Sequence, residues 1–459
     1  MHLSRRGLIA GAATAAAFSG LARATGAEAT AYTNEVHGYG PLVRDPRGIF
    51  DLPAGFSYSI VSMAGDRMSD GLITPFKADG MGCFGLDAER VALVRNHEIK
   101  DDDLELTAFG PDLRLAANVD PRLIYDRDSE GRPLGGGTTT LIYNLRTRHL
   151  ERSHLSLAGT AVNCAGGVTP GGSWLSCEET LLTRGPGARK DHGWVFEVPA
   201  SYAGLVDPTP ITGMGRFRHE ATATDPRTGI VYLTEDTGDG LFYRYLPNDR
   251  ERLLAGGRLQ ALGFKDGPGA DTRNWQTRWW SAGDWQETVW IDLEGVDNPH
   301  DDLRLRGARA GAAPFARGEG IHFGGGELYF TCTSGGPGRL GQIMRYRPGS
   351  SDDEPGQLQL FLEPKSQKAM EMPDNLTITP WGHLVVCEDR SDSKINYLRG
   401  VTPQGRVYAL GRNPAVAADG ETSELAGACF SPDGSTLFVN VYYPGLTLAI
   451  TGPWASFRV

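Results

Sequence analysis

The stretch NCAGGVTPGGSWLSCEE, from Asn163 to Glu179, carries the pattern that decides the fold. It opens on a polar pair, runs through small apolar residues, turns at a cluster of Thr, Pro and Gly, and returns through a second run that ends on two glutamates. Two short runs joined by a turn of this composition are typical of a β-hairpin. The segment therefore predicts two antiparallel strands whose open ends meet at one edge.

Five further segments repeat this layout. They are CFGLDAERVALVRNHE from Cys83, HEATATDPRTGIVYLTED from His219, GEGIHFGGGELYFTCTS from Gly318, PDNLTITPWGHLVVCED from Pro373 and LAGACFSPDGSTLFVNVYY from Leu425. Three of the five intervals between successive turns are about 52 to 57 residues long, with further strand candidates between the hairpins. A repeat of about 50 residues with four short strands is typical of a propeller blade. We therefore predict an all-β, six-bladed β-propeller, with β-sandwiches as the alternative.

One long interval holds an insertion, at about residues 249–315, that is rich in tryptophan. Its tryptophans are Trp275, Trp279, Trp280, Trp285 and Trp290. Such a segment either covers one mouth of the propeller as a lid or packs a small core of its own. We predict a single propeller domain over residues 30–459 that carries this segment as a lid region.

Composition narrows the class of protein. Of 459 residues, 61 are glycine and 28 are proline, a content that fits a globular chain rich in turns. The formal charge of −11 disfavours nucleic-acid binding, which needs a basic surface, and suits a protein that binds cations. The six cysteines include no C-x-x-C pair, so a zinc site of that type is not expected, and their disulfide status is left open.

Residues 1–29 indicate an export signal. Arg5 and Arg6 precede an apolar stretch over residues 8–22, and A-x-A cleavage patterns end at Ala24 and Ala29. The apolar stretch is shorter than the roughly 20 residues of a membrane span. We therefore expect a twin-arginine signal, transfer by the twin-arginine export machinery to the periplasm or the exterior, and no stable membrane anchor.

The ends of the hairpins are the most informative positions. A hairpin returns to the edge where it began, and the innermost strands of a propeller line its central channel. The residues that open and close the six hairpins should therefore converge on one mouth of that channel. The opening residues are Cys83, Asn163, Cys164, His219, Glu220, Glu319, Asp374, Asn375 and Glu424. The closing residues are Asn96, His97, Glu98, Glu178, Glu179, Glu235, Asp236, Thr333, Glu388, Asp389 and Asn440.

Many of these side chains are carboxylates, and like charges crowded into a channel of low dielectric repel one another strongly. Bound cations would relieve this repulsion. Oxygen ligands favour calcium, whereas a thiolate admits a softer metal such as iron. The alternative is that these polar strand ends serve only for hydrogen bonding and turn capping.

Five motifs resemble those of the PhoX-type alkaline phosphatases: NCAGGVTPGGSWLSCEE, GRFRHEA, FARGEG, PDNLTITPWGHL and FSPDGSTLFVN. The resemblance runs from about Gly55 to the C-terminus and is strongest from Cys164 to Glu179 and in the last two hairpins. It implies a six-bladed propeller exported by the twin-arginine route. It also implies hydrolysis of phosphate monoesters with calcium ions and a pair of irons held in the channel.

The resemblance assigns metal-binding roles to individual residues. Cys164 matches the family's iron-binding cysteine, and Glu179 or its neighbour Glu178 matches a calcium-binding carboxylate. Glu220 matches a metal-binding glutamate, and Glu319 matches a glutamate that bridges metals.

Further residues complete the expected site. Asp374 and Asn375 fall on the family's P-D-N motif and are expected calcium ligands, and Arg317 matches an arginine that contacts the phosphate. Glu98, which closes the first hairpin, is a further candidate metal ligand. Near the C-terminus the chain departs from the family, because Tyr442 and its neighbour stand before a Pro-Gly pair that a histidine commonly precedes.

In the reaction that this resemblance implies, metals bind the phosphate oxygens and Arg317 clamps the phosphate with two N–H donors. His97 and His219 are candidates for the general acid that protonates the leaving group. The expected partner is a small phosphate ester, and we expect a monomer. The alternatives are a calcium-dependent lactonase and a non-catalytic calcium-binding propeller. Cys164 discriminates between phosphatase and lactonase, because a lactonase has no need of a thiolate.

Overall fold

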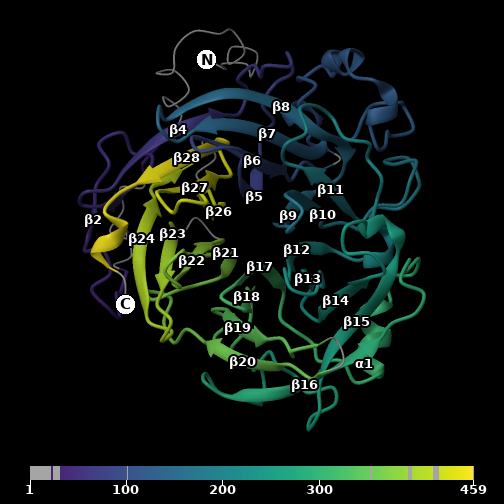
Figure 1. The fold of residues 1–459 in the computed structure, drawn as a ribbon, viewed down its shortest axis with the longest axis vertical. Coiled ribbons are helices and arrows are strands. Elements are labelled where there is room, and N and C mark those ends of the chain that lie inside the picture. The colour runs from purple at the N-terminus through teal and green to yellow at the C-terminus, as the bar shows by residue number, and fades with distance from the viewer. Residues whose placement is uncertain are drawn as a thin grey trace.

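The computed structural model describes residues 22–23, 32–100, 102–351, 354–390, 395–416 and 423–457. Antiparallel sheets stand around a central axis like the blades of a propeller (Figure 1). The prediction of an all-β propeller is confirmed. The predicted export signal lies, apart from two residues, outside the described ranges.

The innermost strands close a ring around this axis. Each of them contacts the next along the chain, and the last contacts the first. In the part of the chain that the structure describes, the ring consists of β5 (Ala78–Gly85), β9 (Asn163–Val168), β12 (His219–Thr224), β17 (Gly318–Gly324), β21 (Pro373–Ile378) and β26 (Leu425–Phe430).

Each innermost strand begins a meander that runs outward. The first blade continues through β6 (Arg90–His97), β7 (Gly136–Asn144) and β8 (His149–Thr160), and the second through β10 (Ser173–Glu178) and β11 (Val195–Pro199). The third continues through β13 (Val231–Glu235), β14 (Phe242–Pro247) and β15 (Gly257–Phe264), and the fourth through β18 (Glu327–Cys332), β19 (Gln342–Arg347) and β20 (Gln357–Leu362). The fifth continues through β22 (Leu384–Glu388), β23 (Asn396–Val401) and β24 (Val407–Asn413).

The last blade closes the ring with a strand from the other end of the chain. It contains β26, β27 (Thr436–Val441) and β28 (Leu446–Thr451), and β4 (Ser57–Met63) pairs with β28 as its outer strand. Because β4 precedes the first blade in sequence, this pairing ties the first blade to the last. Side chains of the two blades also pack together, as Tyr143 does on Phe438 with ring centroids 5.4 Å apart.

The tryptophan-rich insertion begins inside the third blade. Its first strand, β15, is the outer strand of that blade, and β16 (Trp285–Asp292) pairs with both β15 and β20 at the outer edge of the ring (Figure 1). The third and fourth blades therefore share one nine-stranded sheet. The short helix α1 (Leu303–Arg309) follows β16 before the chain returns to the centre.

The tryptophans of this insertion pack largely at the periphery. Trp279 and Trp280 contact Phe264 of β15, with ring centroids 4.6 and 5.7 Å away, and Trp290 lies on β16. Trp275 differs, because its Nε1 donates to a carbonyl of the loop after β18 at 2.7 Å. Most of the insertion thus extends the outer edge of the sheet.

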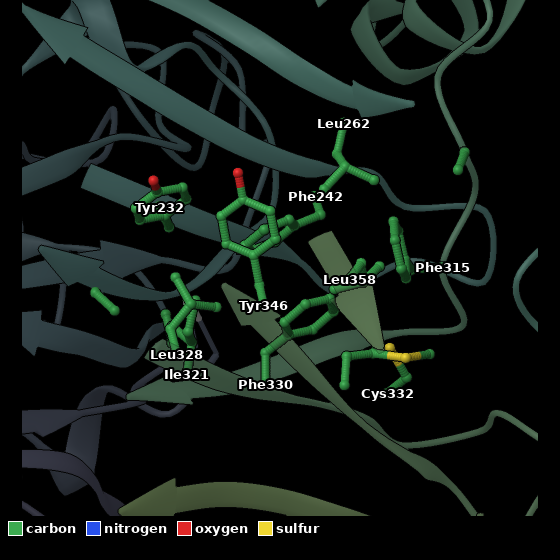
Figure 2. Close-up of a cluster of buried hydrophobic side chains, with 14 of the residues drawn as sticks. Tyr232, Phe242, Leu262, Phe315, Ile321, Leu328, Phe330, Cys332, Tyr346 and Leu358 are labelled. Carbon is green, nitrogen blue, oxygen red and sulfur yellow. The ribbon is translucent and has the colours of Figure 1, made fainter. Parts of the chain in front are cut away.

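The hydrophobic core lies mainly between neighbouring blades. Figure 2 shows a large cluster in which side chains of the third and fourth blades meet. Phe242 of β14 stacks on Phe330 of β18 at 4.3 Å, and Tyr232 of β13 lies 5.5 Å from Tyr346 of β19. Burial of such aromatic surface holds adjacent blades together.

The remaining elements are short. Two small sheets pair β1 (Ala22–Arg23) with β25 (Ala415–Val416) and β2 (Leu42–Val43) with β3 (Leu52–Pro53). The 3₁₀ turns are Leu104–Leu106, Arg114–Asn118, Pro121–Leu123, Thr212–Met214, Leu253–Ala255 and Trp454–Ser456. Across the described ranges, no helix has the length and apolar character needed to cross a membrane. All six cysteines are free thiols.

Adjacent innermost strands approach so closely that only small residues fit between them. A Cβ on Gly320 of β17 would lie 2.6 Å from the Cα of Asn375 in β21. A Cβ on Gly80 of β5 would lie 2.5 Å from the Cα of Ala165 in β9. Main-chain atoms in a packed interior cannot move aside as the end of a flexible side chain can. The width of the channel therefore depends on a small residue at this position.

We expect G320A to lower the free energy of unfolding by at least about 2 kcal/mol, because its methyl group overlaps the main chain of the next blade. G171A is the matched control, since its Cβ would meet only the Thr169 Oγ1 atom at 3.6 Å. Urea unfolding of both variants measures the effect. Equal stability of G320A and the parent protein would contradict the close approach of the strands.

Candidate metal centre

A β-bulge interrupts the inner hairpin of the blades. In the first blade two residues of β5, Asp79 and Gly80, face a single residue of β6, Asn96. The same two-to-one register occurs in the next four blades, and the sixth also has a register shift. A bulge re-aims the side chains of its extra residue. In five blades the first bulged residue is a potential metal ligand: Asp79, Cys164, Glu220, Glu319 and Asp374.

A second set of side chains follows the second strand of each hairpin. The backbone N–H of Glu98 donates to the carbonyl of Lys77, immediately before β5, at 3.0 Å. The equivalent bond recurs in all six described blades, so this set lies at one level of the ring. The donors are Glu98, Glu179, Asp236, Thr333, Asp389 and Tyr442, and the acceptors are Lys77, Val162, Arg218, Arg317, Met372 and Glu424.

Acidic side chains from different blades thereby come within reach of shared cations. Three groups have ligand atoms that all lie within 4.8 Å of one another. The groups are Cys164, Glu179 and Glu220; Glu220, Glu319 and Asp374; and Asp79, Glu98 and Glu424. Glu220 belongs to the first two groups, and the Cys164 Sγ lies 3.7 Å from the Asp79 Oδ2 of the third. We call these eight residues the channel centre.

Within the described part of the chain, some carboxylate oxygens of the channel centre lack the hydrogen-bond donors that buried carboxylates need. Glu220 is fully buried, yet no described residue donates a hydrogen bond to either of its carboxylate oxygens. The Oδ1 atom of Asp79 is also buried without a partner. A buried charge that is neither paired nor hydrogen-bonded is strongly unfavourable. These residues therefore fit bound cations, with one thiol among oxygen donors.

Burial and mutual repulsion shift the titration of the channel centre. Burial raises the pKa of Glu220 well above its usual range, and the charges of Glu319 and Asp374 raise it further. Burial likewise raises the pKa of Asp374 to about 7, and that of the Cys164 thiol well above its usual range. Burial also raises the pKa of Asp79, Glu98, Glu179, Glu319 and Glu424. Bound cations would oppose these shifts, because they favour the charged forms.

Arg317 lies beside the second group. Its Nε and Nη2 donate to the two carboxylate oxygens of Asp236 at 2.8 and 3.0 Å, and Nη2 also donates to Glu319 Oε1 at 2.8 Å. The side chain is 32% exposed, and its Nη1 makes no hydrogen bond within the described part of the chain. Two carboxylates thus orient the guanidinium and leave one N–H edge for a ligand.

The third group is bounded by the sixth blade. The Tyr442 hydroxyl donates to Glu98 Oε2 at 2.5 Å, and the Lys100 Nζ lies 3.8 Å from Glu98 Oε1. Tyr442 occupies the ring position at which four other blades carry an acid. A neutral donor at this position reduces the negative charge of the channel centre.

Glu178 does not belong to the channel centre, and its prediction as a metal ligand is corrected. Its carboxylate accepts hydrogen bonds from three backbone amides and contacts His192 Nδ1 at 2.7 Å. His192 Nε2 lies 3.1 Å from Asp126, so the three side chains form a buried triad. Successive residues of a strand point to opposite faces. Of the two adjacent glutamates, Glu179 therefore reaches the channel.

His97 and His219 also point away from the channel centre. His97 Nδ1 donates to the Phe76 carbonyl at 2.8 Å and its Nε2 contacts the Thr139 hydroxyl at 2.9 Å. His219 Nε2 donates to the Gly215 carbonyl at 2.9 Å. Both rings are fully buried, and burial lowers the pKa of each. The prediction that either acts as the general acid is therefore corrected.

Two residues predicted to open hairpins at the channel mouth, Cys83 and Asn375, make other contacts. Cys83 lies within β5 and packs near Cys429 in the core between the first and last blades. Asn375 uses its amide between blades, donating to Asp374 Oδ1 at 3.1 Å and accepting from the Gly427 amide at 3.0 Å. Asn375 thus links the ligand Asp374 to the sixth blade.

Asp79 is the ligand that the hairpin layout alone misses, because that layout starts the first hairpin at Cys83. A shorter signal identifies it. In five blades a carboxylate or thiol is followed by Gly, Ala or Asn: Asp79-Gly80, Cys164-Ala165, Glu220-Ala221, Glu319-Gly320 and Asp374-Asn375. The first residue of each pair is the ligand, and the second lies where neighbouring strands approach. Glu424 precedes the sixth inner strand and lies outside this pattern.

These features define a β-propeller with a buried, acidic channel whose ligand groups fit cations. The chain belongs to the family described as alkaline phosphatase PhoX, whose model matches residues 37–445. The resemblance inferred from the motifs is thereby confirmed, and the chain is a phosphatase of this family. No curated protein matches the chain.

One solved structure supports the fold, and two others are less similar. The structure of Pseudomonas fluorescens PhoX in complex with vanadate, a transition state analogue, has a TM-score of 0.65 at 19% identity, covering 88% of this chain and 96% of that chain. A gluconolactonase from Xanthomonas campestris, XC5397, has a TM-score of 0.40 at 13% identity, covering 90% and 98%. A luciferin-regenerating enzyme has a TM-score of 0.41 at 10% identity, covering 87% and 96%. Only the first likeness is close enough to bear on the fold.

The buried triad of His192, Glu178 and Asp126 predicts a dependence of stability on pH. Burial lowers the pKa of His192, but the two carboxylates raise it by more, to about 9. The folded pKa thus exceeds the usual value of 6.5, so this contribution is complete below about pH 6.5 and is lost as the pH rises through 9. It amounts to at most about 3 kcal/mol.

Urea unfolding of the parent protein and H192Q between pH 6 and 10 tests this prediction. We expect H192Q to be less stable at pH 6 and the difference to shrink as the pH approaches 10. A difference that stays constant over this range would contradict a charged His192.

Proposed function

We propose that the protein hydrolyses phosphate monoesters with calcium and iron ions bound in the channel centre. The observation that carries the proposal is Glu220, a buried residue that belongs to two ligand groups and whose carboxylate oxygens have no hydrogen-bond donor among the described residues. Membership of the PhoX family supports the reaction class. The vanadate complex of the Pseudomonas fluorescens protein supports a phosphoryl transition state as the species that this centre stabilises.

The donor atoms suggest how the metals are distributed. The group of Cys164, Glu179 and Glu220 contains a thiol and suits iron, because thiolates prefer softer metals. The other two groups offer only carboxylate oxygens and suit calcium. When bound, such cations would neutralise charge on the phosphate oxygens and activate the attacking water.

Arg317 has the geometry of a phosphate-binding residue. Asp236 and Glu319 hold its guanidinium in a fixed orientation, and its Nη1 remains available to donate to a phosphate oxygen. A preoriented donor stabilises developing charge without reorganisation during the reaction. Because Asp236 and Glu319 already offset the positive charge of Arg317, this arginine does not neutralise the other carboxylates of the channel centre.

The wider setting of this activity is also part of the proposal. Arg5 and Arg6 support export by the twin-arginine machinery, which would deliver the enzyme to the periplasm or the exterior as a monomer. The substrate would be a small phosphate ester. The position of Cys164 within a ligand group favours this function over a calcium-dependent lactonase, which needs only oxygen ligands.

Hydrolysis of p-nitrophenyl phosphate by the exported protein tests the proposal. We expect activity that disappears with a calcium chelator, returns when calcium is restored, and is inhibited by orthovanadate. No activity in calcium-replete protein with intact metal content would contradict the proposal. Lactones and phosphodiesters would then be the next substrates to examine.

E220Q should lower this activity about 100-fold, because it removes a charged ligand from two groups at once. The matched control is E294Q, which makes the same change at an exposed position and should retain full activity. In chelator, E220Q should be at least as stable as the parent protein, because one buried like charge is gone. Retained activity in E220Q would contradict its assignment as a ligand.

A further inference from the structure

In the first, third and fourth blades, the residue that faces the bulge donates a side-chain hydrogen bond to the next blade. In the third blade this residue is Thr234, whose hydroxyl donates to the carbonyl of Glu319 in the fourth blade at 2.6 Å. In the fourth blade it is Thr331, whose hydroxyl donates to the carbonyl of Asp374 in the fifth blade at 2.6 Å. Both acceptors are main-chain atoms of ligand residues in the channel centre.

The same contact recurs with asparagine on the other side of the ring. Asn440 of the sixth blade, which pairs with Ala426 next to the bulge and does not face it, donates from Nδ2 to the carbonyl of Asp79 at 2.5 Å. Asn96 of the first blade donates from Nδ2 to the carbonyls of Cys164 at 3.2 Å and Ala165 at 2.6 Å. All four donors are almost completely buried: Asn96, Thr234, Thr331 and Asn440.

The carbonyls that accept these bonds belong to bulged residues, which lie outside the regular hydrogen-bond pattern of their own sheet. A bulge leaves its extra residue without a regular partner in its own sheet. The donor in the preceding blade supplies a partner for that carbonyl. The Cα position of the ligand, and thus the distance between ligands of successive blades, is then set across the blade boundary.

We propose that Asn96, Thr234, Thr331 and Asn440 are positioning residues for the metal ligands of the next blade. This inference rests on the proposed function, because it assumes that the channel centre binds cations. Each residue acts through the main chain of a ligand and contacts no cation itself. Groups one step removed from a metal typically change its affinity by about 10-fold or more when they are lost.

Packing of the blades does not by itself require these donors. The equivalent positions are Cys177 in the second blade and Cys387 in the fifth, so a hydroxyl or amide is dispensable at this place in a blade. Cys177 faces the blade of Glu220, the ligand shared by two groups. Glu220 is thus the one bulged ligand whose carbonyl has no side-chain donor of this type among the described residues.

The test is calcium titration by calorimetry of the full chain after removal of metals. T331V and T234V delete a hydroxyl with almost no change of shape, and we expect the calcium affinity to fall about tenfold in each. T222V is the matched control, because Thr222 is buried near Glu220 but its Oγ1 atom has no hydrogen-bond partner in the part of the chain that is described. Its affinity should equal that of the parent protein.

Two further variants of Thr331 separate the loss of the hydroxyl from a general loss of stability. T331S restores the hydroxyl and should recover the affinity. T331C introduces the residue that two other blades carry at this position, so it should fold, and it should bind calcium as weakly as T331V. Thermal unfolding in chelator measures the purely structural effect of each change.

The outcomes separate the two proposals. If the parent protein binds no calcium, the proposed function fails, and the positioning role fails with it. If the parent protein binds calcium and T331V, T234V and T331C bind it equally well, only the positioning role is overturned. The same holds if these variants merely unfold at lower temperature, by the same amount with and without calcium.

Discussion

Repulsion between buried carboxylates is the constraint on which the rest of the structure depends. Two such charges at about 4 Å repel by about 4 kcal/mol even at an effective dielectric constant of 20. The channel centre brings seven carboxylates and one thiol together, and Glu220 has no hydrogen-bond donor within the described ranges. Arg317 and Lys100 offset only a part of this charge. Bound cations would offset the remaining repulsion between these carboxylates.

The propeller meets this constraint through local geometry repeated around a ring. In five blades the bulge turns one ligand toward the channel, and each hairpin end adds a second position at the same level. Small residues beside the ligands, such as Gly80 and Gly320, allow neighbouring strands to approach. The pairing of β4 with β28 closes the ring. Side chains far apart in sequence thus reach one centre, because they lie on strand bulges and at the ends of hairpins.

Much of this arrangement could be predicted from the sequence, because hairpins are local. The spacing of the hairpin turns predicted the blades, and the acidic hairpin ends predicted where the centre lies. The wrong assignments concern positions at which a shift of one residue along the strand changes the side that a side chain faces. Strand alternation turns Glu178 and His97 into their own blade and leaves their neighbours Glu179 and Glu98 in the channel. Alternation predicts the direction of a side chain only when the position of the bulge is known, because a bulge shifts the register of the inner strands. The insertion was harder to place, because β16 pairs with strands of two different blades.

Anomalous X-ray scattering from crystals of the exported protein tests the central claim most directly. Data collected on both sides of the iron absorption edge, and at a long wavelength where calcium scatters anomalously, identify and locate each ion. The account predicts an iron signal beside Cys164, Glu179 and Glu220, and calcium signals within the two all-carboxylate groups. A channel centre without anomalous signal, in which Glu220 is hydrogen-bonded to a neighbouring carboxyl group, would contradict it.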